Sequence, residues 1–504
     1  MKNIYNKLII LFAVILTLTA CQQEKGSSPV SVTGMNLEKN TMDITIFSSI
    51  QLKPVFTPAN ASNKKVKWSS SDPDIVSVDN GGTITAIKFT DTETYTGQAT
   101  ITGTTLDGGF TDTCVVTVTM AAQVHITELP PLKNEFMDFF MIGNIFDPQD
   151  ITGEEPYTIN KPWLTHHYNI LTPQNQMKPN YLCGRTPGGA VPGEYDAANI
   201  ATAKRMIDAA HAKGIKIQGH CLLWHSQIPA WQASLRTSSD TKEQVLAYLK
   251  EYITYVVNEF KGSIYAWDVL NEVFKDGVSA GSDWKKTAMR DGDSGNPWYM
   301  KLGADFVYEG FLAARLADPD IILYYNDYSL DQVGKATMVR NMVRDVNNQY
   351  ATEHPEANGR KLIEGIGMQS HHNSGVTAAD VKKTLDLFRP LGVKISISEL
   401  DVLAQSWSEY DAKPTVPVTT AGLLKQANQY GEFFKVFLDN ADIIERVTFW
   451  GVSDINSWRS SGLPLPFTGE RDGEGWFAPL KPESVKAKPA YYKIINALEE
   501  KQAE

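Results

Sequence analysis

Residues 263–272 read Ser-Ile-Tyr-Ala-Trp-Asp-Val-Leu-Asn-Glu, an apolar, strand-like run that ends in a carboxylate. Residues 394–401 repeat this design as Lys-Ile-Ser-Ile-Ser-Glu-Leu-Asp, so Glu272 and Glu399 occupy similar positions in two segments. A carboxylate at the tip of a strand can reach into a groove while a sheet holds its backbone in place. Two such tips indicate paired-carboxylate chemistry, which the hydrolysis of glycosidic bonds requires.

The chain from residue 130 to residue 500 alternates strand-like and helical patterns, after a boundary at Pro130 and Pro131. The strand-like runs are residues 139–143, 168–171, 215–219, 264–269, 321–325, 362–368, 393–398 and 446–450. Helical patterns between them include residues 197–213, 241–260, 300–316 and 423–440. Eight strands joined through helices favour a closed (β/α)8 TIM barrel, an α/β fold. No Gly-x-Gly-x-x-Gly sequence follows the first run, which argues against a dinucleotide-binding fold.

Polar and aromatic side chains gather at the expected carboxyl ends of these strands, where a TIM barrel carries its functional residues. They are Gln174, Asn175, Lys178, His220, Trp224, Gln227, Asn271, Glu272, Tyr328, Gln369, His371, Glu399, Asp401, Trp450 and Trp458. One polar strand end would be a solvated rim, but this many Asn, Gln, His, Glu and Trp residues are typical of a polyol-binding site.

Four motifs occur in order on these strands: Gly-His-x-Leu-x-Trp-His-Ser-Gln, Trp-Asp-Val-x-Asn-Glu, Gln-Ser-His and Ser-Glu-Leu-Asp. Together they resemble glycoside hydrolase family 10, the retaining endo-β-1,4-xylanases, over nearly the whole barrel. The resemblance implies cleavage of internal β-1,4 bonds of xylan by double displacement. It makes Glu272 the general acid/base and Glu399 the nucleophile. A retaining mechanism needs carboxyl groups about 5–5.5 Å apart, and strands four and seven face each other across a barrel of eight.

The resemblance also implies supporting roles around the two glutamates. Asn271 is expected to hydrogen-bond the sugar 2-hydroxyl, and Gln369 to complete the hydrogen bonds near the acid. His371 is expected to lie against Glu399, with Asp401 orienting the imidazole. The residues matched to substrate binding are Gln174, Asn175, Lys178, His220, Trp224, Gln227, Tyr328, Trp450 and Trp458.

One motif departs from the family. Where the family usually has Glu-Asn-Glu-Met-Lys, residues 174–178 read Gln-Asn-Gln-Met-Lys. Gln174 keeps a carbonyl acceptor but lacks the negative charge, so its hydrogen bonds to sugar hydroxyls are weaker. This difference is expected to affect the affinity for sugar on the glycone side, and it leaves both expected catalytic glutamates in place.

Other functions remain open at this stage. His220, His225, His371 and His372 could suggest a metal site, but histidines among Trp and Gln fit sugar contacts better, so we expect no metal and no cofactor. Asp268 is expected to be a buried structural carboxylate. The alternatives are a family 10 relative that prefers another β-1,4-glycan, and a non-catalytic surface glycan-binding protein, against which the Glu272 and Glu399 pair argues.

The first residues predict export. Lys2 and Lys7 accompany an apolar run at residues 8–18 that is too short to span a bilayer. Leu-Thr-Ala-Cys at residues 18–21 resembles the bacterial lipoprotein box, which implies a signal peptide at residues 1–20 and lipidation of Cys21. A polar, Gly/Ser-containing tether is expected at residues 21–30. The protein would then be lipid-anchored at a bacterial cell surface or periplasmic face, on the outer membrane if the source is Gram-negative.

Residues 31–120 have an all-β texture, with short alternating strands and turn sequences such as Asn-Gly-Gly at residues 80–82. The segment around Trp68 resembles the bacterial group 2 immunoglobulin-like domain, so we expect a small sandwich that acts as a spacer, with Trp68 in its core. A formal charge of −11 offers no basic patch for nucleic acid. Cys114, Cys183 and Cys221 are too few and too scattered for a disulfide framework or a structural zinc site. We expect a monomer.

Overall fold

The computed structural model describes residues 28–46, 48–87, 96–119, 124–184, 191–412, 416–473 and 480–504. The chain divides into two compact units, Met1–Thr119 and Met120–Glu504. The expected signal peptide, Cys21 and most of the tether lie outside the described residues. Within these ranges, no helix combines the length and the apolar character that crossing a bilayer requires.

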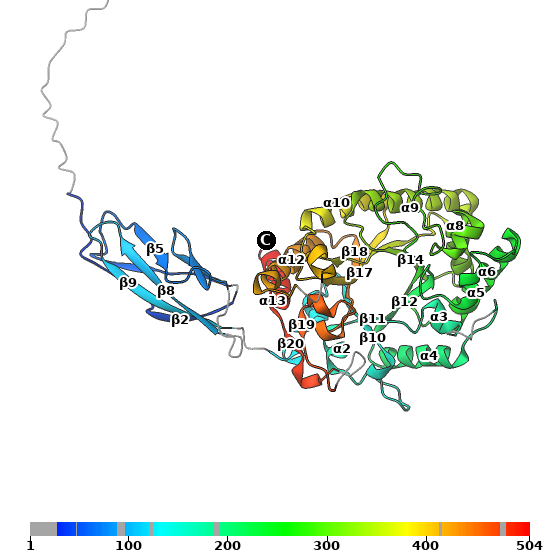
Figure 1. Ribbon diagram of the computed structural model, residues 1–504, viewed down its shortest axis with the longest axis horizontal. Helices are drawn as coiled ribbons and strands as arrows, with labels where there is room; N and C mark the ends of the chain where they lie inside the picture. The colour runs from blue at the N-terminus through cyan, green and yellow to red at the C-terminus, as the bar shows by residue number, and fades with distance from the viewer. Residues whose placement is uncertain are drawn as a thin grey trace, which may run out of the picture. The chain divides into compact units, whose positions relative to one another are not determined.

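The described part of the first unit consists of strands and contains no helix (Figure 1). Its strands are β1 (Gly34–Leu37), β2 (Thr41–Thr45), β3 (Ser49–Gln51), β4 (Pro54–Thr57), β5 (Val66–Ser70), β6 (Val76–Val78), β7 (Thr83–Ala86), β8 (Thr96–Thr105) and β9 (Thr111–Thr119). They form sheets in the orders β2-β9-β8-β5, β3-β7-β6 and β1-β4. Ile84, Ile101 and Val116 are fully buried between them, and Trp68 packs against this core. The expected immunoglobulin-like sandwich is confirmed.

Eight parallel strands form the barrel of the second unit. They are β10 (Met141–Phe146), β11 (Ile170–Pro173), β12 (Lys216–Leu223), β13 (Ala266–Asn271), β14 (Ile322–Asp327), β15 (Gly365–Met368), β17 (Lys394–Val402) and β18 (Ile444–Phe449). Each pairs in parallel with the next, and β18 pairs with β10, so the sheet closes. The (β/α)8 barrel is confirmed.

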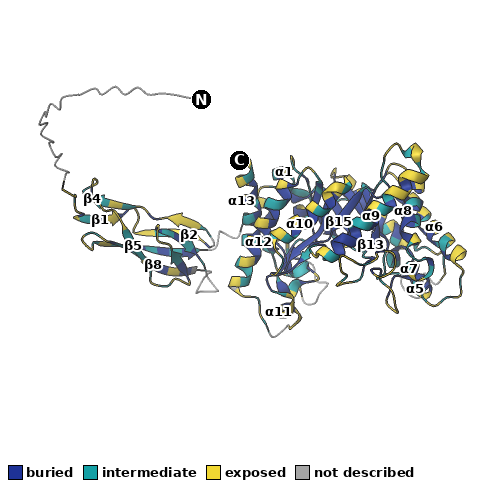
Figure 2. Cartoon of the chain, turned by 90° about the horizontal axis from the view of Figure 1, so that it is seen from above, coloured by how far each residue is buried: buried dark blue, intermediate teal, exposed yellow. Residues whose placement is uncertain are grey.

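Helices surround this barrel, with their buried faces toward the strands (Figure 2). The longer ones are α4 (Ala197–His211), α6 (Lys242–Glu259), α8 (Asp305–Ala317), α9 (Val333–Glu353), α10 (Ala378–Phe388), α12 (Thr420–Asp439) and α13 (Pro489–Ala503). The shorter ones are α1 (Leu132–Glu135), α2 (Pro162–His167), α3 (Pro179–Leu182), α5 (Ala230–Ser234), α7 (Pro297–Leu302) and α11 (Trp407–Asp411). Short strands β16 (His371–His372), β19 (Phe467–Thr468) and β20 (Lys486–Ala487) complete the unit.

The single helix expected at residues 300–316 is wrong in one respect, because the segment forms two helices. Asn296 caps α7, and its side chain accepts hydrogen bonds from the backbone of Trp298 and Tyr299. Gly303 then ends α7 with φ of +67°. This left-handed conformation favours glycine and stops the helix.

Two strands also extend further than their apolar runs suggested. The run expected at residues 393–398 continues as β17 to Val402, because β16 pairs with its last residues at Asp401 and Val402. Glu399 and Asp401 therefore lie within a strand rather than in the loop after it. Similarly, β12 runs to Leu223 and includes His220. The barrel sheet thus holds these side chains, although the strand pairing shifts register between His220 and Leu223 and between Ile397 and Leu400.

Candidate active site

Glu272 follows β13 directly, and neutral N–H groups surround its carboxylate. The Trp224 indole donates to Oε2 at 2.9 Å, and the Gln369 amide donates to Oε1 at 2.9 Å. The Asn271 amide also reaches Oε1, at 3.3 Å. The φ of Glu272 is +57°, a left-handed conformation that a non-glycine residue adopts at some cost in strain. This turn of the backbone, together with the three donors, sets the direction of the side chain.

Glu399 is almost fully buried and receives different partners. Asn326, from β14, donates to Oε1 at 2.8 Å, and Nε2 of His371 lies 3.1 Å from Oε2. The other ring nitrogen of His371, Nδ1, lies 2.9 Å from Asp401. Asp401 in turn forms an ion pair with the fully buried Arg459. The expected arrangement of His371 and Asp401 beside Glu399 matches this geometry. Arg459 adds a fourth residue to this row of contacts.

Negative and positive charges alternate along the row of contacts from Glu399 to Arg459. Burial raises the pKa of Glu399, but hydrogen bonds from His371 and Asn326 and the nearby imidazoles outweigh burial and hold that pKa below its usual value. Burial alone would lower the pKa of His371. The carboxylates of Asp401 and Glu399 outweigh burial and raise this pKa to about 9. Burial raises the pKa of Asp401, and Arg459 with His371 brings it below the usual value. At neutral pH, Glu399 is therefore ionised beside a protonated imidazole.

A chain of amides connects the two glutamates. Oδ1 of Asn271 accepts hydrogen bonds from Asn326 at 3.0 Å and from Gln369 at 3.2 Å. The same amide groups of Asn326 and Gln369 donate to Glu399 and Glu272 respectively. Asn271 thus fixes the position of both carboxylates relative to each other, and its own amide N–H groups point toward the Glu272 side.

The stability of the protein should depend on the charge of His371. The pKa of His371 is about 9 in the folded protein and about 6.5 in the unfolded chain. Protonated His371 therefore stabilises the folded state fully below about pH 6.5, and this stabilisation is lost as the pH rises through about 9. We expect the difference in unfolding free energy between wild type and His371→Gln to shrink by about 3 kcal/mol from pH 6 to pH 10. Urea titrations at the two pH values measure it, and a pH-independent difference would contradict a protonated His371.

A second cluster, of Asn175, Lys178, Trp224 and Gln227, lies next to Glu272. The buried Lys178 ammonium donates to Asn175 at 3.2 Å and to Gln227 at 2.8 Å, and lies 5.2 Å from the Trp224 ring centre. Gln227 also donates to Asn175, at 3.2 Å. Since Trp224 contacts Glu272 directly, the four side chains expected to bind substrate form one wall beside this carboxylate.

Two tryptophans follow β18 on another side of the carboxylates. Trp450 is buried, and its ring centre lies 5.4 Å from that of His220 and 6.4 Å from that of His371. Trp458 is 52% exposed, and its ring centre lies 5.2 Å from that of His371. Both rings therefore border the site, and Trp458 presents open surface to a ligand.

Two other side chains have structural partners. His220 is held by Asp268, with Nδ1 2.9 Å from Oδ2, and Gln218 donates to the other Asp268 oxygen at 2.8 Å. Asp268 is buried, as expected for a structural carboxylate. The Tyr328 hydroxyl donates to Asp276 at 2.8 Å and also contacts Arg290. That hydroxyl is already engaged, so Tyr328 can offer substrate only part of its surface.

Gln174 lies beside a pair of partly buried carboxyl groups. It lines a cavity of about 60 Å³ together with Asp147 and Asp150. Burial and the neighbouring Asp150 raise the pKa of Asp147 to about 7, and burial raises that of Asp150 to about 6. A glutamate at position 174 would add a third carboxyl group to this hollow, which gives a physical reason for the neutral glutamine.

Gln174→Glu should therefore destabilise the protein in a pH-dependent way. Near pH 8 the pair is ionised, and we expect a loss of about 1 kcal/mol from like-charge repulsion, while near pH 5 the pair is largely protonated and the loss should vanish. Thermal melting at both pH values measures this effect. Gln174→Met, which is similar in size and uncharged, is the matched control, and an equal pH dependence in both variants would rule out repulsion.

Sequence reasoning assigned no role to three partners of the site, although Asn326 and Arg459 stand among the polar residues at the strand ends. Asn326 and Arg459 stand next to residues singled out by the motifs, but their roles depend on which strands are neighbours in the closed barrel. Arg290, whose Nε donates to the Glu272 backbone carbonyl at 3.0 Å, comes from the long segment between β13 and α7. For Arg290 the sequence offers no signal.

The four histidines considered as metal ligands do not converge. Nδ1 of His225 lies 3.9 Å from Glu272, and burial lowers the pKa of this ring to about 4. Burial lowers the pKa of His372 to about 3. Over the residues that the structure describes, no group of three or more His, Cys, Asp or Glu side chains could hold a metal ion.

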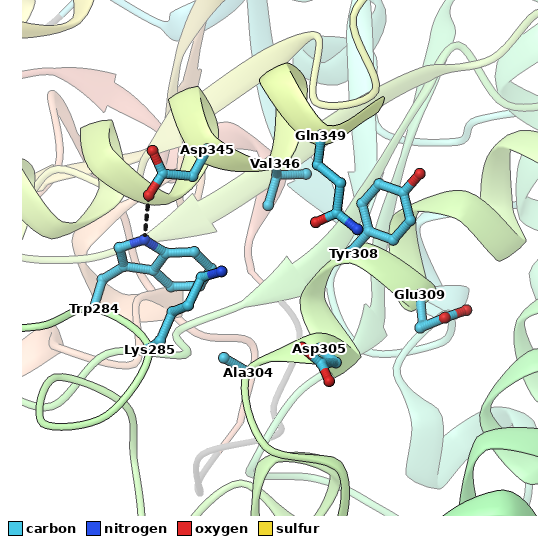
Figure 3. A pocket seen from close by; sticks show the side chains of 9 residues that line it. All are labelled: Trp284, Lys285, Ala304, Asp305, Tyr308, Glu309, Asp345, Val346 and Gln349. Carbon is cyan, nitrogen blue, oxygen red and sulfur yellow. Dashed lines mark hydrogen bonds between the residues drawn. The ribbon is translucent and has the colours of Figure 1, made fainter. Parts of the chain in front are cut away.

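A separate cavity of about 260 Å³ lies among the outer helices (Figure 3). Trp284, Tyr308, Glu309 and Asp345 line it. The Trp284 indole donates to Asp345 at 2.8 Å, and Glu309 forms an ion pair with Lys250 at 2.8 Å. The Trp284–Asp345 hydrogen bond lies within the lining, whereas the Tyr308 hydroxyl donates to Glu353, which is outside it.

Comparisons with known proteins agree with this geometry. Residues 132–497 match the model for glycosyl hydrolase family 10, and residues 31–116 match the bacterial Ig-like domain (group 2). Endo-1,4-beta-xylanase A of Thermotoga maritima is 30% identical over 398 residues, which are 76% of this chain and 34% of that protein. Endo-1,4-beta-xylanase B of Paenibacillus barcinonensis is 32% identical over 73% of this chain and 99% of that protein. The chain thus spans about a third of the length of the first of these relatives.

Solved structures of xylanases also match this chain, one of them over both of its units. A bacterial Ig-like domain containing GH10 xylanase from termite gut is 44% identical, with a TM-score of 0.71, and covers 92% of this chain and 99% of that one. Xylanase XynB from Paenibacillus barcinonensis is 28% identical, with a TM-score of 0.59, over 73% of this chain and 99% of that one. From its barrel, its paired glutamates and these matches, the chain belongs to glycosyl hydrolase family 10 and carries a bacterial group 2 Ig-like domain before the catalytic barrel.

Proposed function

We propose that the protein is a retaining endo-β-1,4-xylanase that hydrolyses internal bonds of xylan. One observation carries the proposal most directly. Glu399 is held ionised by a protonated His371, whereas Glu272 receives its hydrogen bonds from an indole and two amides. Environments that differ in this way divide two carboxyl groups into a nucleophile and an acid/base.

The reaction has two steps. In the first, a Glu399 oxygen attacks the anomeric carbon while Glu272 protonates the departing glycosidic oxygen, and a covalent glycosyl ester forms. In the second, Glu272 removes a proton from water, which attacks the same carbon and releases Glu399. Each displacement inverts the anomeric centre, so the two together retain its configuration.

The neighbouring residues position the sugar for these steps. Because Oδ1 of Asn271 accepts from two amides, its own N–H groups remain directed toward the acid, where the sugar 2-hydroxyl would lie. Asn175, Lys178 and Gln227 would hold hydroxyls of the adjoining sugar. Trp450 and Trp458 would cover the apolar faces of the rings. The amide contacts strengthen as charge develops at the anomeric carbon.

The test is digestion of unsubstituted xylan, with cellulose in parallel. We expect reducing ends to appear on xylan, with oligosaccharides of several lengths at early times, as internal cleavage produces. Glu399→Ala serves as the inactive control. A single short product from the first minutes would contradict internal cleavage, and no release above the control would contradict the activity.

A second candidate has some support from the comparisons. A relative from Acetivibrio thermocellus, 30% identical over 73% of this chain and 30% of that protein, is named exoglucanase XynX. A preference for another β-1,4-glycan is therefore the alternative, and faster release from cellulose than from xylan would favour it.

We further propose that Cys21 is lipidated and anchors the protein to a bacterial membrane, at the cell surface or periplasmic face. Leu-Thr-Ala-Cys at residues 18–21 after the apolar run supports this proposal. Labelling with a radioactive fatty acid in the native host tests it. Label in the wild type and none in Cys21→Ser is expected, and equal labelling would contradict it.

A further inference from the structure

The proposed mechanism leaves one exposed tryptophan without a role. Trp407 is 45% exposed, and with Trp458 it is one of two tryptophans in the described ranges that are largely open to solvent. A single exposed apolar side chain needs no explanation, but two large rings close together, beside a substrate site, indicate a binding surface.

The structure fixes Trp407 firmly for an exposed residue. It begins α11, which projects from the barrel in Figure 2. The Ser406 hydroxyl and the Glu409 carboxylate cap this helix reciprocally. Tyr410 is buried against Trp407, and the backbone N–H of Ala404 donates to the Gly462 carbonyl at 3.0 Å. The segment after β17 is thus attached to the segment after β18, which carries Trp458.

Arg459 connects Trp407 to the catalytic residues. Its guanidinium carbon lies 4.7 Å from the Trp407 ring centre and 5.7 Å from that of Trp458. Arg459 is fully buried and paired with Asp401, and within the described residues its Nε and Nη2 make no hydrogen bond. A cation held in this way supports one side of the Trp407 ring and leaves the rest of the exposed surface free.

We propose that Trp407 is a sugar-stacking platform that extends the substrate groove beyond Trp458 and binds a main-chain xylosyl unit remote from the cleaved bond. The inference rests on the proposed function and adds a further subsite to it. Continuity supports the choice of ligand. Trp458 lies next to His371, and Trp407 lies on the same guanidinium, so a chain leaving the catalytic centre past Trp458 meets Trp407 next. The rigid support lowers the cost of ordering the ring on binding.

The experiment compares a long and a short substrate, xylohexaose and an aryl β-xylobioside, because only the long one can reach a remote subsite. In Trp407→Ala we expect the ratio of kcat/KM for xylohexaose to kcat/KM for the aryl xylobioside to fall about fivefold, mostly through KM. Trp407→Phe keeps a ring and should hold the ratio within about twofold of wild type. Leu316→Ala, at a 70% exposed position on α8, is the surface control and should leave the ratio unchanged.

The ratio of the two kcat/KM values distinguishes a Trp407 that binds sugar from a Trp407 that only holds Arg459 in place. If Trp407 acts only by holding Arg459, both substrates lose activity equally and the ratio stays constant, which would overturn the platform. No change on either substrate would overturn it as well. A wild type that cleaves neither substrate would instead overturn the proposed function. In the Glu399→Ala background, Trp407→Ala should weaken xylohexaose binding in calorimetry by a similar factor, and unchanged binding would contradict the proposal.

Discussion

Glu399→Ala is expected to lower kcat on xylan by about four orders of magnitude or more. The variant removes the carboxylate that lies between Asn326 and a protonated His371. Without it, no glycosyl ester forms, and direct attack by water is slow because Glu272, on the side of the leaving oxygen, cannot also take the proton of that water. Initial rates of reducing-sugar release measure the effect.

Glu399→Gln is the matched variant for this test. It keeps the size of the side chain and can still contact Asn326, but it cannot act as a nucleophile. Both variants should still bind xylo-oligosaccharides and melt cooperatively. Activity within about tenfold of wild type in both variants would show that another residue attacks the anomeric carbon.

Glu272→Ala is expected to separate two kinds of substrate. On xylan, whose leaving group is an alcohol, kcat/KM should fall by about two to four orders of magnitude, because the departing oxygen is no longer protonated. A dinitrophenyl β-xylobioside carries a leaving group that needs no proton, so its kcat/KM should fall by less than about tenfold.

The comparison of the two substrates is the essential control for Glu272. Loss of the Trp224 and Gln369 contacts could disturb the groove, but such a disturbance would affect both substrates. An equal loss on both would therefore contradict the role of Glu272 as acid/base. Trp224→Phe, which removes the indole N–H on Oε2 and keeps a smaller aromatic ring, should give a smaller loss with the same preference for the activated substrate.

The fold and the central residues could be predicted because their signals are local. Eight apolar runs separated by helical patterns predict a barrel, and Glu272 and Glu399 each come shortly after such a run, at the end of β13 and within β17. His371 and Asp401 belong to motifs of the same kind. A closed barrel gathers the strand ends at one end of the fold, and the resemblance to family 10 supplied the expected contact of His371 with Glu399 and the role of Asp401.

The remaining features depend on long-range packing. Arg459 contacts Asp401 because the segment after β18 folds back over β17, and Asn326 contacts Glu399 across the barrel end. The left-handed φ of Glu272 cannot be predicted from a sequence that reads as a continuing strand. The neutral Gln174 was visible in the sequence, but the reason for it, the neighbouring carboxyl groups of Asp147 and Asp150, became visible only with the cavity that all three line.

Proton NMR during the first minutes of hydrolysis tests the central claim most directly. If Glu399 and Glu272 act as nucleophile and acid/base, each new reducing end appears first as the β-anomer, and the α-anomer follows only by mutarotation. Xylo-oligosaccharides longer than the groove, at enzyme concentrations that outpace mutarotation, give the clearest signal. The α-anomer as first product would contradict a retaining double displacement and the assignment of Glu399 as nucleophile.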